Sequence, residues 1–245
     1  GISHFVEHLV FKGTERRPTP EKISSVIERV GGEINAGTEQ ELTVYWCKVP
    51  KHHLSESIDL LLDMLRNSVY AKEELEREKS VILEEQSMIQ DYPHQKVEMV
   101  LDSLLWPNHP LGRDISGTPE SITNMSRKMV LDHVHRFYTP ANMVLSVAGD
   151  INHDGVVEQV EEICTGWESR PVPDWIPFTA DQSGSQVGIE YRNTGQSNIA
   201  IGFPGLSYRH PQRHALDLIS IVLGDGMSSR LFLEIRERKG LAYDV

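Results

Sequence analysis

The stretch HFVEH at residues 4–8 places two imidazoles and one carboxylate within five consecutive residues. The apolar residues around it predict a helix that ends near Gly13. Residues i and i+4 of a helix lie one above the other on the same face, so His4 and His8 can both reach a single metal ion. Imidazole nitrogen suits Zn²⁺, and a catalytic zinc site holds a third protein ligand and an open position for water. The sequence therefore predicts another ligand elsewhere in the chain.

Glu7 stands one residue before the second histidine, on an adjacent part of the same helix face. From there it can reach a water on the metal without being a ligand itself. The order H-x-x-E-H is the inverse of H-E-x-x-H and is known as the inverzincin form. The alternative is that His4 and His8 are ordinary polar residues of an amphipathic helix, because short patterns recur by chance.

The composition limits the class of protein. The chain has 245 residues and a formal net charge of −12, which is long enough for one large domain or one domain and part of another. The acidic balance argues against a nucleic-acid partner and permits an acidic chamber that attracts basic peptides.

No apolar run reaches transmembrane length, and no signal-peptide pattern is present. Cys47 and Cys164 are too few for a disulfide framework or a cysteine zinc site, so we expect a soluble protein from a reducing compartment.

Hydrophobic periodicity predicts many helices and few strands. Helices are expected near residues 3–12, 20–30, 54–68, 72–90, 97–105, 119–124, 126–138, 155–163, 214–223 and 229–239. Strands are expected at 33–49, 143–149, 187–189 and 199–203.

The expected helix at 72–90 is the place to look for the third metal ligand. Most of its carboxylates form a solvated acidic face, but Glu78 and Glu85 interrupt a stripe that is otherwise apolar. Seven residues are nearly two helical turns, which leaves the pair only about 20° apart around the axis. A partly buried carboxylate needs a cation or hydrogen-bond donors. One of the two would bind the metal and the other would orient a histidine or water, while spacing alone leaves Glu84 as a competitor.

The second half of the chain suggests a linker and a weak repeat. Residues 170–184 hold three prolines and little periodicity, which is typical of a linker. The order helix, loop, helix, glycine and strand occurs at 4–45 and again at 214–245, which suggests a second domain built like the first but without its histidines. The chain opens at Gly1 without an initiator methionine and stops at Val245 where a strand begins, so we expect part of a longer chain.

These motifs, taken together, resemble the insulinase/pitrilysin family of zinc peptidases, and most closely its processing-peptidase branch. The resemblance rests on GISHFVEHLVFKGT at 1–14, GEINAGT at 32–38, EKSVILEE at 78–85, HPLGR at 109–113, SSRLF at 228–232 and GLAY at 240–243. The matching segments are spread over the whole chain and occur in the family's order.

The resemblance implies roles for the site residues. In the family's pattern the distal ligand follows an upstream glutamate by seven residues, which implies that Glu85 binds Zn²⁺ together with His4 and His8. Glu78 would hold a ligand residue in place without binding Zn²⁺ itself. Glu7 would act as the base that takes a proton from the attacking water and passes it to the leaving amine.

The resemblance also implies the fold and the domains. The expected class is α+β, with an antiparallel sheet and helices packed on it, duplicated, and with the second copy truncated. The zinc-bearing domain would cover 1–170, a linker 171–185, and the beginning of a second domain without zinc 186–245.

Substrate binding is implied at two further places. Asn35, Ala36 and Gly37 match the family's edge strand, where an extended peptide adds as another strand; the alternative is an ordinary edge or turn. Arg236 and Tyr243 match a pair that holds the substrate and the developing oxyanion; the alternative is a surface charge and a core residue. In processing-peptidase-like members this pair faces the zinc domain of a partner, so we expect a homodimer or a heterodimer with a related subunit.

The predicted function is a zinc-dependent endopeptidase that cleaves unstructured peptides or presequences, basic ones by preference, in a chamber between two halves. The alternatives are a non-catalytic structural subunit and a peptide-binding member of the same family. We expect a bacterial cytoplasmic protein, with the mitochondrial matrix as the alternative, no nucleic-acid partner and no membrane span.

Overall fold

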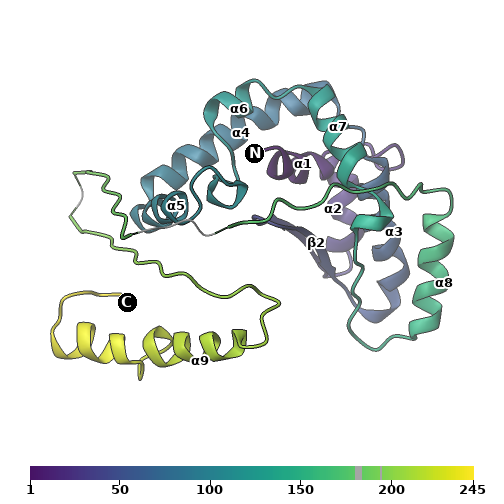
Figure 1. Ribbon diagram of the computed structural model, residues 1–245. Helices are drawn as coiled ribbons and strands as arrows, with labels where there is room; N and C mark the ends of the chain where they lie inside the picture. Colours follow the sequence, from purple (N-terminus) through teal and green to yellow (C-terminus); the bar gives the residue numbers. More distant parts are fainter. Residues whose placement is uncertain (180–183, 194) are drawn as a thin grey trace. The chain divides into compact units, whose positions relative to one another are not determined.

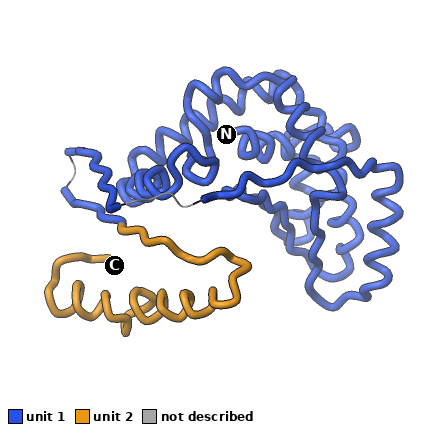
Figure 2. Tube along the Cα trace, viewed as in Figure 1, with its two compact units in different colours: residues 1–200 blue, residues 201–245 orange. Residues whose placement is uncertain are grey.

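The computed structural model describes residues 1–179, 184–193 and 195–245. The chain divides into two compact units, residues 1–200 and residues 201–245 (Figure 2). Part of the predicted linker, residues 180–183, lies outside the described residues. The predicted domain boundaries at 170 and 186 therefore stay predictions.

The first unit is rich in helices, and the predicted ones are present to within a few residues at each end. Its helices are α1 (Ile2–Val10), α2 (Pro20–Glu28), α3 (Leu54–Asn67), α4 (Lys72–Asp91), α5 (Pro93–Leu105), α6 (Pro119–Thr123), α7 (Arg127–Phe137) and α8 (His153–Cys164). Short 3₁₀ turns occur at Lys51–His53, Pro110–Gly112 and Pro140–Asn142.

The segment 33–49, predicted to be strand, does form strands, but it folds back on itself as a hairpin that was not predicted from the sequence. Strands β1 (Glu33–Thr38) and β2 (Thr43–Lys48) pair antiparallel, with Asn35 opposite Trp46 and Thr38 opposite Thr43. The backbone N–H of Glu39 donates to the carbonyl of Leu42 at 2.8 Å and closes the polar turn. With helices packed on this antiparallel sheet, the α+β class predicted from the sequence is confirmed.

The other three predicted strands, at 143–149, 187–189 and 199–203, are not formed in the described part of the chain. Their apolar residues do suit a strand, but a strand needs a neighbour that satisfies its backbone N–H and C=O groups. No described strand lies beside them, and most of their large apolar side chains are exposed, as with Val144 at 96% and Ile189 at 87%.

Helix α1 lies at the centre of the first unit, in contact with the sheet, α4 and α7 (Figure 1). Its side chains Phe5, Val6, Leu9 and Val10 are almost completely buried. Burying a side chain of this size contributes about 1.5–3 kcal/mol, so these four residues fix the helix firmly in place. The same core cluster includes Ile23, Ile27, Leu60, Met64, Leu75, Ile82, Ile122 and Val130.

A buried polar cluster anchors the chain just after α1. The Asp63 side chain is 1% exposed, and its carboxylate accepts from the Thr14 hydroxyl at 2.7 Å, from Arg17 at 2.5 Å and from Asn67 at 2.9 Å. Gly13 enters this turn with φ +148°, and a Cβ there would meet the Pro18 carbonyl oxygen at 2.9 Å. The turn therefore requires glycine.

The second unit contains α9 (Arg213–Gly224) and a π-helical segment at Phe232–Arg238. Most of its apolar side chains are exposed, including Leu218 at 64%. Among the described residues, no helix has both the length and the apolar character needed to cross a membrane.

The Asp63 cluster gives the first prediction. Asp63→Ala removes the buried carboxylate that accepts from Thr14, Arg17 and Asn67, and leaves the Arg17 guanidinium only its second partner, Asp59, so we expect it to lower the free energy of unfolding by about 3 kcal/mol. The matched control is Asp132→Ala, which removes an i,i+4 ion pair with Lys128 whose two side chains are 64% and 83% exposed. That change should cost about 0.5 kcal/mol or less. Urea unfolding measures both, and equal losses would contradict an anchoring role for Asp63.

Candidate metal centre

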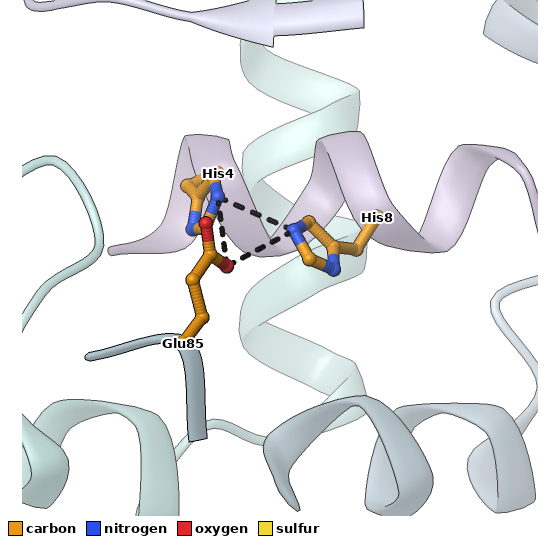
Figure 3. Close-up of side chains that lie close together, drawn as sticks. All are labelled: His4, His8 and Glu85. Carbon is orange, nitrogen blue, oxygen red and sulfur yellow. Dashed lines mark hydrogen bonds and ion pairs between the residues drawn. The ribbon is translucent and has the colours of Figure 1, made fainter. Parts of the chain in front are cut away.

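His4 and His8 lie one turn apart on α1 and direct the same ring atom to one point (Figure 3). The two Nε2 atoms are 3.2 Å apart, and both side chains are partly buried. The rings meet nearly edge to face, with centroids 4.6 Å apart. The i,i+4 spacing thus brings the two histidines together as the helical period requires.

Glu85 completes the group from α4 (Figure 3). Its Oε2 lies 3.6 Å from the Nε2 atom of His4 and 3.6 Å from that of His8. Within the described residues, these three are the one group of histidine, cysteine or carboxylate side chains whose ligand atoms lie close enough to hold a metal ion. Glu84, which spacing alone left as a competitor, is exposed and outside the group.

The three ligand atoms match the dimensions of a zinc site. Zinc to nitrogen and oxygen distances of about 2.0–2.2 Å give a tetrahedron with edges of about 3.3–3.6 Å. The observed separations of 3.2, 3.6 and 3.6 Å lie close to those edges. Two imidazoles and one carboxylate also form a donor set that zinc peptidases use, with a fourth position left for water. We call His4, His8 and Glu85 the metal centre.

The electrostatic surroundings keep His4 ready to bind a cation. Burial and the neighbouring His8 lower the pKa of His4 below its ordinary value, although Glu85 and Glu7 act in the opposite direction. A lower pKa favours the neutral imidazole, which is the form that binds metal. The buried Nδ1 atom of His4 has no hydrogen-bond partner among the described residues.

Glu78 stands behind His8, on the side away from the other ligands. Its side chain is 5% exposed, and its Oε2 lies 3.0 Å from His8 Nδ1. Its Oε1 lies 2.5 Å from the Lys12 ammonium. Burial raises the pKa of Glu78, but hydrogen bonds from His8 and Lys12 outweigh burial and hold that pKa below its ordinary value. A carboxylate on Nδ1 fixes the His8 ring so that Nε2 faces the metal.

Glu7 is held separately from the three ligand residues. It is partly buried on α1, and its Oε2 accepts a hydrogen bond from the Thr38 hydroxyl of β1 at 2.5 Å. Thr38 also lies 3.3 Å from the Thr43 hydroxyl on β2. The sheet therefore positions a carboxylate beside the metal centre without making it a ligand.

The predicted substrate-binding residues occupy two places. Asn35, Ala36 and Gly37 lie within β1, which pairs on one edge with β2, while no described strand pairs with its other edge. Arg236 and Tyr243 belong to the unit 201–245, where the Arg236 guanidinium stacks 4.8 Å from the Tyr243 ring. The structure thus brings this pair together, and its relation to the metal centre stays a prediction.

Sequence reasoning missed two residues of the site, Lys12 and Thr38. Lys12 lies four residues after His8, so helical spacing offered a signal for it. Thr38 follows Ile34 and Ala36 on the inward face of β1, where a hydroxyl needs a partner. Neither signal identifies the carboxylate that each residue contacts, because both contacts join segments distant in the sequence.

Comparison with sequence families identifies the family of the chain. The profile of the insulinase family, peptidase family M16, matches residues 1–119, and that of the peptidase M16 inactive domain matches residues 124–245. The chain belongs to the insulinase family of peptidases, M16.

Similar proteins are named as zinc proteases. The chain is 36% identical over 245 residues to the uncharacterized zinc protease YmxG of Bacillus subtilis, covering all of this chain and 59% of that one. It is 38% identical over 252 residues to an uncharacterized zinc protease of Mycobacterium leprae, covering 56% of that relative. The chain therefore spans little more than half the length of these curated relatives.

Solved structures share the fold. A protease from Helicobacter pylori superposes with a TM-score of 0.87 at 23% identity, over 99% of this chain and 59% of that one. A peptidase M16 inactive domain from Pseudomonas fluorescens gives a TM-score of 0.83 at 18% identity, over all of this chain and 60% of that one. These likenesses support the family's α+β architecture.

The geometry predicts which of two adjacent glutamates binds the metal. Glu85→Gln removes a charged oxygen from the metal centre and should weaken zinc binding by about 10-fold or more. Glu84→Gln is the matched control, because it makes the same chemical change one residue away on the exposed side of α4. Competition with a chromophoric chelator measures both affinities. A larger loss in Glu84→Gln would show that the ligand is misassigned.

Proposed function

We propose that this chain is the zinc-bearing part of a metalloendopeptidase that cleaves extended peptides. The observation that carries the proposal is the placement of Glu7. This carboxylate lies one residue before His8 on α1, one of its oxygens is held by Thr38, and it is outside the group of three convergent ligand residues. A site built only to hold a structural zinc would use a fourth protein ligand and would have no need of a separately held base.

Each residue has one part in the reaction. His4, His8 and Glu85 would hold Zn²⁺, which when bound would supply Lewis acidity and lower the pKa of a water at the site. Glu7 takes the proton of the attacking water and gives it to the leaving amine, as general base and then general acid. Thr38 keeps one Glu7 oxygen fixed, so that the other stays free to face the water. Glu78 keeps His8 in the orientation that points Nε2 at the metal.

The edge of β1 that no described strand pairs with supports an extended peptide as the substrate. An edge strand binds an extended peptide through main-chain hydrogen bonds, with little demand on side chains. Asn35, Ala36 and Gly37 would supply this edge in the proposed enzyme. The formal net charge of −12 favours basic peptides over acidic ones. Folded proteins would be poor substrates because their strands are already paired.

One observation favours a second candidate function. Residues 124–245 match the peptidase M16 inactive domain, which is consistent with a non-catalytic subunit. The metal centre and Glu7 lie in residues 1–119, which match the insulinase profile, and this favours catalysis. A peptide-binding protein without turnover would retain zinc and bind peptide while leaving it uncut.

The role of Glu7 gives the third prediction. In the full-length protein, Glu7→Gln should keep bound zinc and lower kcat by about 10²–10⁴-fold, because the amide cannot accept the proton. Zinc content and cleavage of an unstructured basic peptide measure the two effects. Loss of zinc equal to that of Glu85→Gln would mean that Glu7 is a ligand. Unchanged turnover would show that the base lies elsewhere.

The fourth prediction concerns sharing of the active site between subunits. We propose that Arg236 and Tyr243 of one subunit stabilise the oxyanion at the metal centre of its partner, which makes a homodimer or related heterodimer necessary. Full-length Glu7→Gln subunits and Arg236→Ala subunits should each be inactive as homodimers. After mixing, each mixed dimer should regain one site with an intact Glu7 and an intact Arg236.

Subunit exchange must be shown independently in that experiment, for example with two affinity tags on the two variants. A matched mixture of Glu7→Gln subunits with His4→Ala subunits provides the control, because both changes fall in the zinc-bearing half. That mixture should stay inactive. Exchange without recovered activity in the first mixture would contradict the shared site.

A further inference from the structure

We propose that Lys12 is a positioning residue of the metal centre, acting through Glu78 on His8. This inference rests on the proposed zinc site and adds to it a residue that contacts neither metal nor substrate. The Lys12 ammonium holds one oxygen of the Glu78 carboxylate, which leaves the other oxygen aimed at His8 Nδ1.

The contacts form a continuous chain. Lys12 Nζ lies 2.5 Å from Glu78 Oε1, and Glu78 Oε2 lies 3.0 Å from His8 Nδ1. The His8 Nε2 atom then faces His4 and Glu85 in the metal centre. Each Glu78 oxygen thus has its own partner.

Because Glu78 is buried, the loss of its contact with Lys12 would change the orientation of its carboxylate. Its side chain is 5% exposed, so water cannot readily replace a missing partner. A buried carboxylate oxygen left without a donor costs free energy, and the group can regain a partner by turning about its soft terminal torsion. Such a turn would take Oε2 away from His8 Nδ1. Lys12 therefore fixes the rotation of the group that fixes the imidazole.

The position of Lys12 in the chain explains how it reaches Glu78. Helix α1 ends at Val10, and the Lys12 backbone N–H donates to the Leu9 carbonyl at 3.0 Å in the tightened last turn. Its side chain is 27% exposed, so its stem is largely covered while its charge meets α4. A simple structural ion pair between α1 and α4 would use the same contact, and the test must separate the two roles.

The experiment compares zinc affinity in full-length variants by chelator competition, with urea unfolding of the metal-free proteins in parallel. Lys12→Met should weaken zinc binding by about 10-fold, at the lower end of the effect of outer partners of a ligand. Lys12→Arg keeps a donor and a charge, and should restore affinity to within about 3-fold of the wild type. A purely structural ion pair would lower stability without this selective loss and rescue of zinc affinity.

Lys79→Met is the matched control. Lys79 is the residue after Glu78, its side chain is 16% exposed, and its ammonium pairs with Glu76 at 3.0 Å instead of with the site. The change removes a charge of the same kind from the residue next to Glu78 on α4 and should leave zinc affinity unaltered. Should Lys12→Met not fold, Lys12→Gln, which keeps a polar tip without the charge, carries the same comparison.

A double-mutant cycle tests whether Lys12 affects zinc binding through Glu78. If Lys12 acts through Glu78, adding Lys12→Met to Glu78→Gln should weaken zinc binding no further. Equal affinities of Lys12→Met and Lys79→Met, or a full additional loss in the Glu78→Gln background, would overturn the inference. A wild-type protein that binds no zinc would instead refute the proposed function, so the two failures are distinguishable.

Discussion

The packing of α1 against α4 is the contact on which the metal centre depends. The two helices are far apart in the sequence, and each contributes ligands that are useless without the other. Apolar residues hold them together, with Phe5 and Leu9 from α1 and Leu75 and Ile82 from α4 in one buried cluster. The polar groups of the site sit at the edge of this cluster, where rigid neighbours limit their motion.

The three glutamates at the edge of this buried cluster differ in the charged groups that surround them. Glu78 is nearly enclosed and is neutralised by Lys12 and held by His8, so it is unavailable to a metal. Glu85 is 33% exposed and faces two imidazole nitrogens, and no lysine or arginine of the described residues pairs with it, so a metal ion would supply the cation it lacks. Glu7 accepts a hydrogen bond from a hydroxyl instead of pairing with a charged side chain. The three glutamates therefore have different partners, and the different tasks that we propose for them rest on that difference.

Much of this site could be predicted from the sequence, because helical periodicity is a local property. The i,i+4 spacing of His4 and His8, and the apolar stripe that contains Glu78 and Glu85, required no tertiary information. Spacing alone did not choose between Glu84 and Glu85, because one residue of rotation decides which side chain faces α1, and only the family resemblance pointed to Glu85. The contacts of Lys12 and Thr38 could not be predicted from the sequence either, because each joins a residue on one element to a partner on another.

The strands, in contrast, could not be predicted from local sequence alone. The segment at 33–49 has strand-forming residues throughout, but the polar turn after Thr38 divides it into a hairpin. The apolar segment at 143–149 has a strand composition and no strand beside it among the described residues, so it forms none. Strand formation depends on a neighbouring edge as well as on composition, and a single sequence does not reveal that edge.

The most direct test of the account is anomalous diffraction at the zinc absorption edge from crystals of the zinc-loaded full-length protein. The account predicts one strong peak about 2.0–2.2 Å from His4 Nε2, His8 Nε2 and a Glu85 oxygen, with Glu7 and Glu78 outside ligand distance. A peak bound by Glu7, Glu78 or Glu84 in place of Glu85, or a zinc ion held elsewhere in the chain, would contradict it.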